Sequence, residues 1–123
     1  MPKNEIKIKL ILASLLFVLM VVILSSGRGI ASIYSNKFKG KKTASGEIYS
    51  PKKLTAAHRS LPLGTLVRVI NIKNGRKVIV KINDRGPYEK GRMIDLSYEA
   101  ARRLGITKKG LAKVKIEVLS REN

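Results

Sequence analysis

An apolar run near the N-terminus constrains the fold of this chain most strongly. Leu10–Leu24 spans 15 residues, contains one polar side chain, Ser14, and follows three lysines among the first nine residues. A helix of this length reaches roughly 22 Å at about 1.5 Å per residue, which is short against a hydrocarbon core of about 30 Å. A positive start before a short apolar stretch is typical of a secretory signal peptide. We therefore expect an exported protein in which residues 1–27 form a signal peptide, or a membrane anchor through residues 10–24.

The rest of the chain, residues 28–123, is long enough for one domain with a modest core. It holds 23 Lys and Arg against 7 Asp and Glu, a net charge of +16 that favours polyanionic partners. Export argues against nucleic acid, which leaves anionic polymers of the cell wall or an anionic membrane surface. The sequence contains no cysteine and a single histidine, so thiolate sites and zinc sites with several imidazoles are excluded. We expect neither a metal nor a cofactor.

Short strand patterns separated by turn residues dominate residues 28–123. The clearest pattern, at 112–119, alternates apolar and charged residues with a period of two. Strands are expected at 29–34, 54–57, 66–70, 77–82, 93–96 and 112–119. Six short strands with long loops, including a polar loop at 37–53, favour a small closed barrel.

Turn and cap residues refine this expectation. Asn74-Gly75 lies between two strand patterns and predicts a hairpin, because this pair accepts positive φ at both turn positions. A single short helix is expected to begin after Ser97 as the N-cap, to run to Leu104 and to end at Gly105. The domain is therefore predicted to be mainly β, with one short helix.

Six short motifs occur in the order seen in one known family. They are GIASIY at 29–34, TASGE at 43–47, LTAAH at 54–58, LPLGT at 61–65, NDRGP at 83–87 and GRMIDLS at 91–97. This set resembles the RlpA-like (rare lipoprotein A) proteins, which are double-psi β-barrels whose best-studied members are lytic transglycosylases of peptidoglycan. The resemblance covers about residues 29–119 and implies a six-stranded double-psi β-barrel. The IDLS letters also resemble a motif of expansins and related endoglucanases, in which the aspartate acts on a glycan.

The resemblance implies a site with one acid/base carboxyl group and polar helpers. A lytic transglycosylase needs no enzyme nucleophile, because the C6 hydroxyl of muramic acid attacks its own anomeric carbon. Three carboxylates of residues 28–123 lie within the matching motifs. The candidate catalytic residues are Asp95, Asp84, Glu47 and His58, and the candidate substrate contacts are Tyr34, Arg85 and Tyr88.

Each candidate also has a plainer structural interpretation. Asp95 lies between apolar neighbours, so burial would raise its pKa, whereas a place at the start of the helix would lower it. Asp84 is either a residue of the cleft or a turn-capping carboxylate paired with Arg85. Glu47 is otherwise a solvated loop charge, and His58 is otherwise a structural histidine.

The predicted function is therefore that of an exported, monomeric lytic transglycosylase of the periplasm or cell envelope. It would cleave the MurNAc–GlcNAc bond of peptidoglycan glycan strands and leave 1,6-anhydromuramic ends. The alternative is a non-catalytic, expansin-like module that binds or loosens the wall. A basic nucleic-acid-binding barrel is a third class, which the apolar N-terminus disfavours.

Overall fold

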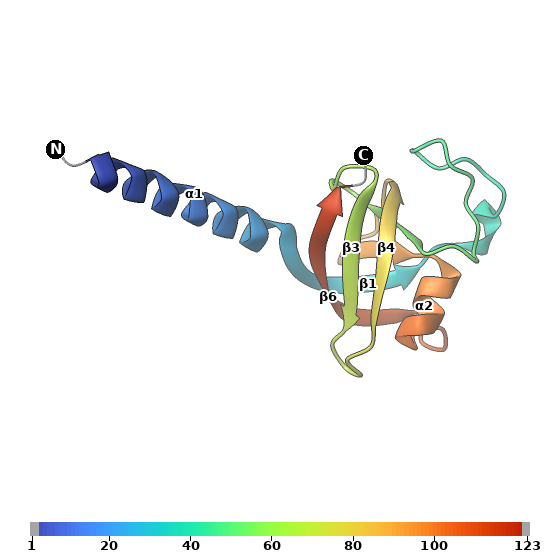
Figure 1. Cartoon of the computed structure of the whole chain (residues 1–123). Helices are drawn as coiled ribbons and strands as arrows, with labels where there is room; N and C mark the ends of the chain where they lie inside the picture. The colour runs from blue at the N-terminus through green and yellow to red at the C-terminus, as the bar shows by residue number, and fades with distance from the viewer. Residues whose placement is uncertain (1–2, 122–123) are drawn as a thin grey trace.

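The computed structural model describes the backbone of residues 3–121 and the side chains of residues 3–18 and 27–120. Residues 1–2 of the expected leader, the side chains of 19–24 in its apolar run, and residues 122–123 of the expected domain lie outside this description. Figure 1 shows a helix projecting from a β-barrel. The elements in chain order are α1 (Lys3–Ser25), β1 (Ser26–Ile33), the 3-10 helix η1 (Asn36–Phe38), β2 (Thr55–His58), β3 (Thr65–Asn71), β4 (Lys77–Asp84), β5 (Arg92–Leu96), α2 (Tyr98–Leu104) and β6 (Leu111–Arg121).

Six strands close into one barrel in the order β1-β5-β2-β4-β3-β6. Two pairs are parallel, β1 with β5 and β2 with β4, and each runs between strands that are not consecutive in the chain. The other four pairs are antiparallel. The expected double-psi β-barrel of six strands is confirmed, as is the short helix between β5 and β6.

The barrel interior is filled by the side chains that point inward from the strands. Residues of β3 alternate between buried and half-buried along the whole strand, as expected for a sheet with one face toward the core. α2 packs Ala100, Ala101 and Leu104 against this core, and all three are fully buried. The largest fully buried apolar side chains of the strands are Val67, Val69, Val80, Ile82, Ile94, Leu96 and Val114.

The connection between β3 and β4 corrects one expectation. The only described residues with positive φ are glycines, so Gly75 (φ 75°) lies in the left-handed region whereas Asn74 does not. The turn is longer than a two-residue hairpin loop, because Gly75 N–H donates to the carbonyl of Asn71 (2.8 Å) and Asn71 N–H donates to the carbonyl of Arg76 (2.9 Å). A longer turn of this kind needs positive φ at the glycine alone.

The N-terminal helix passes directly into the barrel. α1 ends at Ser25 and β1 begins at Ser26, which pairs with Glu117 of β6. The first barrel strand therefore starts before residue 28, where the domain was expected to begin. Among the described residues, no helix combines the length and apolar character needed to cross a membrane.

Replacing Ser97 with alanine should destabilise the barrel. Ser97 is the N-cap of α2, is 1% exposed, and its hydroxyl oxygen accepts hydrogen bonds from the N–H groups of Ala100 (3.3 Å) and Thr55 (3.5 Å). Losing this cap should lower the free energy of unfolding by about 1–2 kcal/mol, measured by urea unfolding. Ser120→Ala, at an exposed position of β6, should stay within about 0.5 kcal/mol of the parent. Equal stability of Ser97→Ala and Ser120→Ala would contradict the capping role.

Candidate active site

Asp84 and Asp95 lie in one row across neighbouring strands of the barrel. Ala57 of β2 pairs with Asp84 in the parallel β2–β4 ladder and with Asp95 in the antiparallel β2–β5 ladder. Asp95 in turn pairs with Ser32 of β1. Because adjacent strands are about 4.8 Å apart, the backbones of the two aspartates are about 10 Å apart, with Ala57 between them. The structure thus places two of the three carboxylates that the sequence singled out on either side of one residue.

Asp95 is a half-buried carboxyl group with a perturbed pKa. Burial raises the pKa of Asp95 above its ordinary value of 3.8, and the negative charges of Glu89 and Asp84 raise it further. A hydrogen bond from the Ser32 hydroxyl and the charge of Arg92 act in the opposite direction. Asp95 lies in β5, two residues before Ser97, which caps α2 as expected, and burial is the largest influence on its pKa.

Asp84 is held by three donors. Its Oδ1 accepts the N–H groups of Ala44 and Arg85, both at 2.9 Å, and its Oδ2 accepts the hydroxyl of Tyr34. The Arg85 guanidinium points elsewhere, so the alternative of an Asp84–Arg85 ion pair is not found among the described residues. Asp84 therefore fastens the loop after β1 to the end of β4 while remaining half-exposed.

Tyr34 belongs to a cluster of three aromatic rings beside Asp84. Its ring lies 4.3 Å from that of Tyr49 and 5.3 Å from that of Phe38, measured between centroids. Burial and the hydrogen bond to Asp84 raise the pKa of the Tyr34 phenol, so it remains a donor at neutral pH. Tyr49 is 3% exposed although it lies in the loop expected to be on the surface. Tyr49 and Phe38 were missed by sequence reasoning, because neither occurs in a matching motif.

Glu47 lies on the same loop and is engaged by a cation. Its Oε2 accepts a 2.8 Å hydrogen bond from Nζ of Lys81, and its Oε1 accepts the Ser45 hydroxyl at 3.3 Å. The bond from Lys81 lowers the pKa of Glu47. Ser45 N–H also donates to the carbonyl of Asn83 at 3.0 Å, which ties the loop to β4. Glu47 is therefore an ion-paired carboxylate on a loop that Ala44 and Ser45 tie to the end of β4.

His58 and Arg85 together shape the turn that follows β2. Nδ1 of His58 accepts the N–H groups of Ser60 and Leu61, both at 3.1 Å, so Nε2 carries the ring proton when the imidazole is neutral. Burial and the charges of Arg59 and Arg85 lower the pKa of His58. The Arg85 Nη1 donates to the carbonyls of His58 (3.2 Å) and Leu61 (2.7 Å). Arg85 thus braces this turn instead of extending into solvent.

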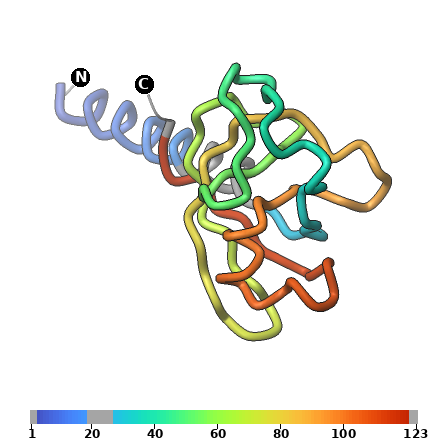
Figure 2. The backbone as a smooth tube through the Cα atoms, turned by 90° about the vertical axis from the view of Figure 1, so that its right-hand side faces the viewer, coloured from blue at the N-terminus to red at the C-terminus, as the bar shows by residue number. Residues whose placement is uncertain are grey.

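Tyr88 lies apart from this network. Figure 2 shows two long loops of the barrel, one after β1 in teal and one between β4 and β5 in gold. Tyr88 is on the second of these loops and is 80% exposed. It contacts neither aspartate through any hydrogen bond among the described residues.

Ser32 is a further polar residue of the candidate site, because its hydroxyl donates to Asp95. The sequence analysis did not single it out, although it lies in the first matching motif.

Comparison with known proteins assigns the family. A family model described as Lytic transglycolase matches residues 26–116. A probable endolytic peptidoglycan transglycosylase RlpA from Nostoc sp. is 58% identical over 98 residues, which are 78% of this chain and 26% of that protein. The endolytic peptidoglycan transglycosylase RlpA of Pasteurella multocida is 56% identical over 91 residues, 74% of this chain and 31% of that protein. The chain thus spans about a quarter to a third of the length of these two relatives.

Solved structures agree on the fold alone. A Streptomyces papain inhibitor superposes with a TM-score of 0.63 at 22% identity, over 77% of this chain and 94% of that one. An expansin of Clavibacter michiganensis superposes with a TM-score of 0.60 at 22% identity, over 77% of this chain and 50% of that one. The match of the family model across all six strands, together with relatives above 50% identity, shows that this chain belongs to the RlpA-like family of lytic transglycolase domains.

Proposed function

We propose that this chain is an exported lytic transglycosylase that cleaves the bond between N-acetylmuramic acid and N-acetylglucosamine in peptidoglycan. The names of its relatives specify both peptidoglycan and transglycosylase. The observation that carries the proposal is the half-buried Asp95, whose pKa is raised, in one row with Asp84. A carboxyl group that stays protonated to higher pH is suited to donate a proton to a leaving glycosidic oxygen.

In this mechanism Asp95 is the general acid and then the general base. Its carboxyl proton moves to the glycosidic oxygen while positive charge develops at the anomeric carbon of the muramic acid. The C6 hydroxyl of the same sugar attacks that carbon, and its proton passes back to Asp95. The enzyme is thereby regenerated and the product ends in a 1,6-anhydro ring, with no water consumed.

The neighbours of the two aspartates have supporting roles. Asp84, oriented by Tyr34, faces the developing positive charge. Ser32 stabilises the ionised Asp95 that remains after proton transfer, because its hydroxyl donates to Oδ1. The Nε2 proton of neutral His58 is a donor for substrate. Glu47 and Arg85 hold the loops that border the site.

Exposed residues on the protein surface would assist binding to the wall. Tyr88 offers an exposed ring to sugar, and the lysine-rich loop at 37–53 attracts anionic wall polymers through charges that salt screens. We place the protein in the cell envelope as a monomer, with residues 1–27 directing export or anchoring it to the membrane.

Replacing Asp95 with asparagine should abolish most of the activity. The change preserves shape while it removes the titratable proton, and general acid–base help contributes about 10²–10⁴-fold. Release of 1,6-anhydromuropeptides from purified peptidoglycan, measured by mass spectrometry, should fall by at least about 10²-fold. Glu117→Gln removes a carboxylate that pairs with Arg68 at 3.0 Å on another part of the barrel and should act as the wild type.

Two outcomes would contradict this assignment. Undiminished release by Asp95→Asn would remove Asp95 from the chemistry. A wild-type protein that binds peptidoglycan and releases no fragments would favour the expansin-like alternative. Retained far-ultraviolet circular dichroism of Asp95→Asn separates loss of chemistry from loss of fold.

The activity should decline as pH rises through the pKa of Asp95, because only its protonated form donates. In Ser32→Ala the bond that favours the ionised form is absent, so the pKa of Asp95 should rise and the alkaline limb should move to higher pH. The pH dependence of kcat/KM for both proteins tests this shift. An alkaline limb that stays in place or moves to lower pH in Ser32→Ala would count against Asp95 as the acid.

A further inference from the structure

A hollow on the barrel surface lies next to the β3–β4 turn and the start of β6. It encloses about 770 Å³, within the range typical of ligand sites, and β1, the β3–β4 turn and the segment between α2 and β6 form its walls. β4 begins at Lys77, just after the β3–β4 turn, and its eight residues reach Asp84 about 23 Å away. The hollow is therefore far from Asp84, whereas Leu111 of its floor pairs with Ser32, the hydrogen-bond partner of Asp95. The proposed mechanism assigns no role to the residues that line it.

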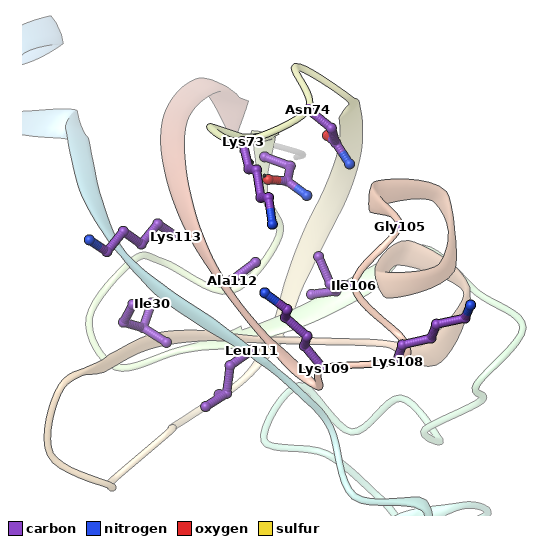
Figure 3. A pocket seen from close by; sticks show the side chains of 11 residues that line it. Ile30, Lys73, Asn74, Gly105, Ile106, Lys108, Lys109, Leu111, Ala112 and Lys113 are labelled. Atoms are coloured by element: carbon purple, nitrogen blue, oxygen red, sulfur yellow. Dashed lines mark hydrogen bonds between the residues drawn. The ribbon is translucent and has the colours of Figure 1, made fainter.

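The hollow combines an apolar floor with a rim of ammonium groups. Figure 3 shows Lys73 and Lys109 extending toward one another across it, with Lys108 and Lys113 on its flanks. All four lysines are exposed, and none forms an ion pair in the part of the chain that the structure describes. The apolar floor consists of Ile30, Ile106, Leu111 and Ala112.

The polar groups of the walls are already satisfied. The side-chain amides of Asn71 and Asn74 both donate to the carbonyl of Leu104, at 2.9 and 3.0 Å. The same two asparagines accept the backbone N–H groups of Lys73 and Arg76 through Oδ1. These bonds fasten the β3–β4 turn to the end of α2, so the hollow is preformed. Recognition of a ligand is left to the ammonium groups and the apolar floor.

We infer that this hollow binds an anionic phospholipid at a membrane surface, with the phosphate among the lysines and the first acyl carbons against the floor. An ammonium rim calls for an anionic head group, and an unpaired cluster of lysines near a lipid surface favours anionic lipids. A sugar or a free phosphate would leave the apolar floor without a partner. Leu111, at 42% exposure, is an apolar side chain that a lipid would cover.

The position of the hollow in the chain supports a lipid surface as its partner. α1 exposes large apolar side chains, among them Leu10 at 65%, Leu15 at 60% and Phe17 at 70%. β1 follows α1 without a linker, and Ile30 of the floor is only five residues beyond Ser25. A lipid bound here would leave the end of β4 that carries Asp84 directed away from the membrane. In this orientation Asp84 would face the wall.

The test measures the accessibility of the lysines on the full chain mixed with vesicles. Acylation of lysine amines is followed by mass spectrometry on vesicles of phosphatidylcholine alone and on vesicles with about one third phosphatidylglycerol. Each lysine near an anionic surface changes binding by about fivefold, so acylation of Lys73 and Lys109 should slow by about fivefold or more on the anionic vesicles. Lys37 and Lys39, on the loop beside the candidate active site, should show the same rates on both.

A matched pair of double variants locates the effect. Lys108→Gln with Lys113→Gln removes two charges from the rim and should reduce the protection of Lys73 and Lys109 to about twofold or less. Lys37→Gln with Lys39→Gln removes the same charge elsewhere and should leave that protection intact. The rim variant should still release anhydromuropeptides from isolated peptidoglycan, so a failure of lipid binding is distinguishable from a failure of the proposed enzymatic function.

Three results would overturn the inference. The first is equal acylation of Lys73 and Lys109 on neutral and anionic vesicles. The second is the same protection when inorganic phosphate is added to neutral vesicles, which would indicate a site for a free anion. The third is protection by soluble peptidoglycan fragments and not by phosphatidylglycerol, which would assign the hollow to the wall.

Discussion

The place of β2 between β4 and β5 is the constraint on which the site depends. Ala57 is 1% exposed and pairs with Asp84 on one side and Asp95 on the other. One of these ladders is parallel and the other antiparallel, and both meet at Ala57 because β2 lies between β4 and β5 in the strand order. Asp84 ends β4 and Asp95 lies within β5, so neither position depends on a flexible loop. The carboxylate spacing is thus a property of the barrel itself.

Asp84 and Asp95 differ in what surrounds them, and this difference separates their roles. Asp84 accepts three hydrogen bonds, two of which come from Tyr34 and Ala44 on the segment after β1. Asp84 therefore holds that segment in place and also contributes negative charge beside Asp95. Its replacement would disturb both the segment and the charge. Asp95 accepts the Ser32 hydroxyl and is desolvated by burial, so its replacement is the cleaner probe of proton transfer.

Local patterns in the sequence were sufficient to predict the six strands and α2, but not η1 or the exact β3–β4 turn. The alternation along β6, the Ser97 cap and the Gly105 stop (φ 74°) are local properties, and all three occur in the structure. The register that places Ala57 between two aspartates is not local, because it depends on strands that are distant in the chain.

The residues of the candidate site could also be predicted only in part from the sequence. Motifs identified Asp84, Asp95 and Tyr34: Tyr34 hydrogen-bonds to Asp84, and the charge of Asp84 acts on Asp95. The contribution of Ser32, the burial of Tyr49 and the inward course of the Arg85 guanidinium depend on tertiary packing. No pattern of neighbouring residues specifies these contacts, so they became visible only in three dimensions.

The titration of Asp95 tests the central assignment most directly. The carboxyl carbon of Asp95 can be followed by NMR as a function of pH, in the wild type and in Ser32→Ala. We expect a pKa above the ordinary value of 3.8 in the wild type and a higher one in the variant, because burial disfavours the charged form and Ser32 opposes that effect. A wild-type pKa at or below 3.8 would mean that Asp95 is ionised too readily to act as the acid, and the proposed mechanism would be wrong.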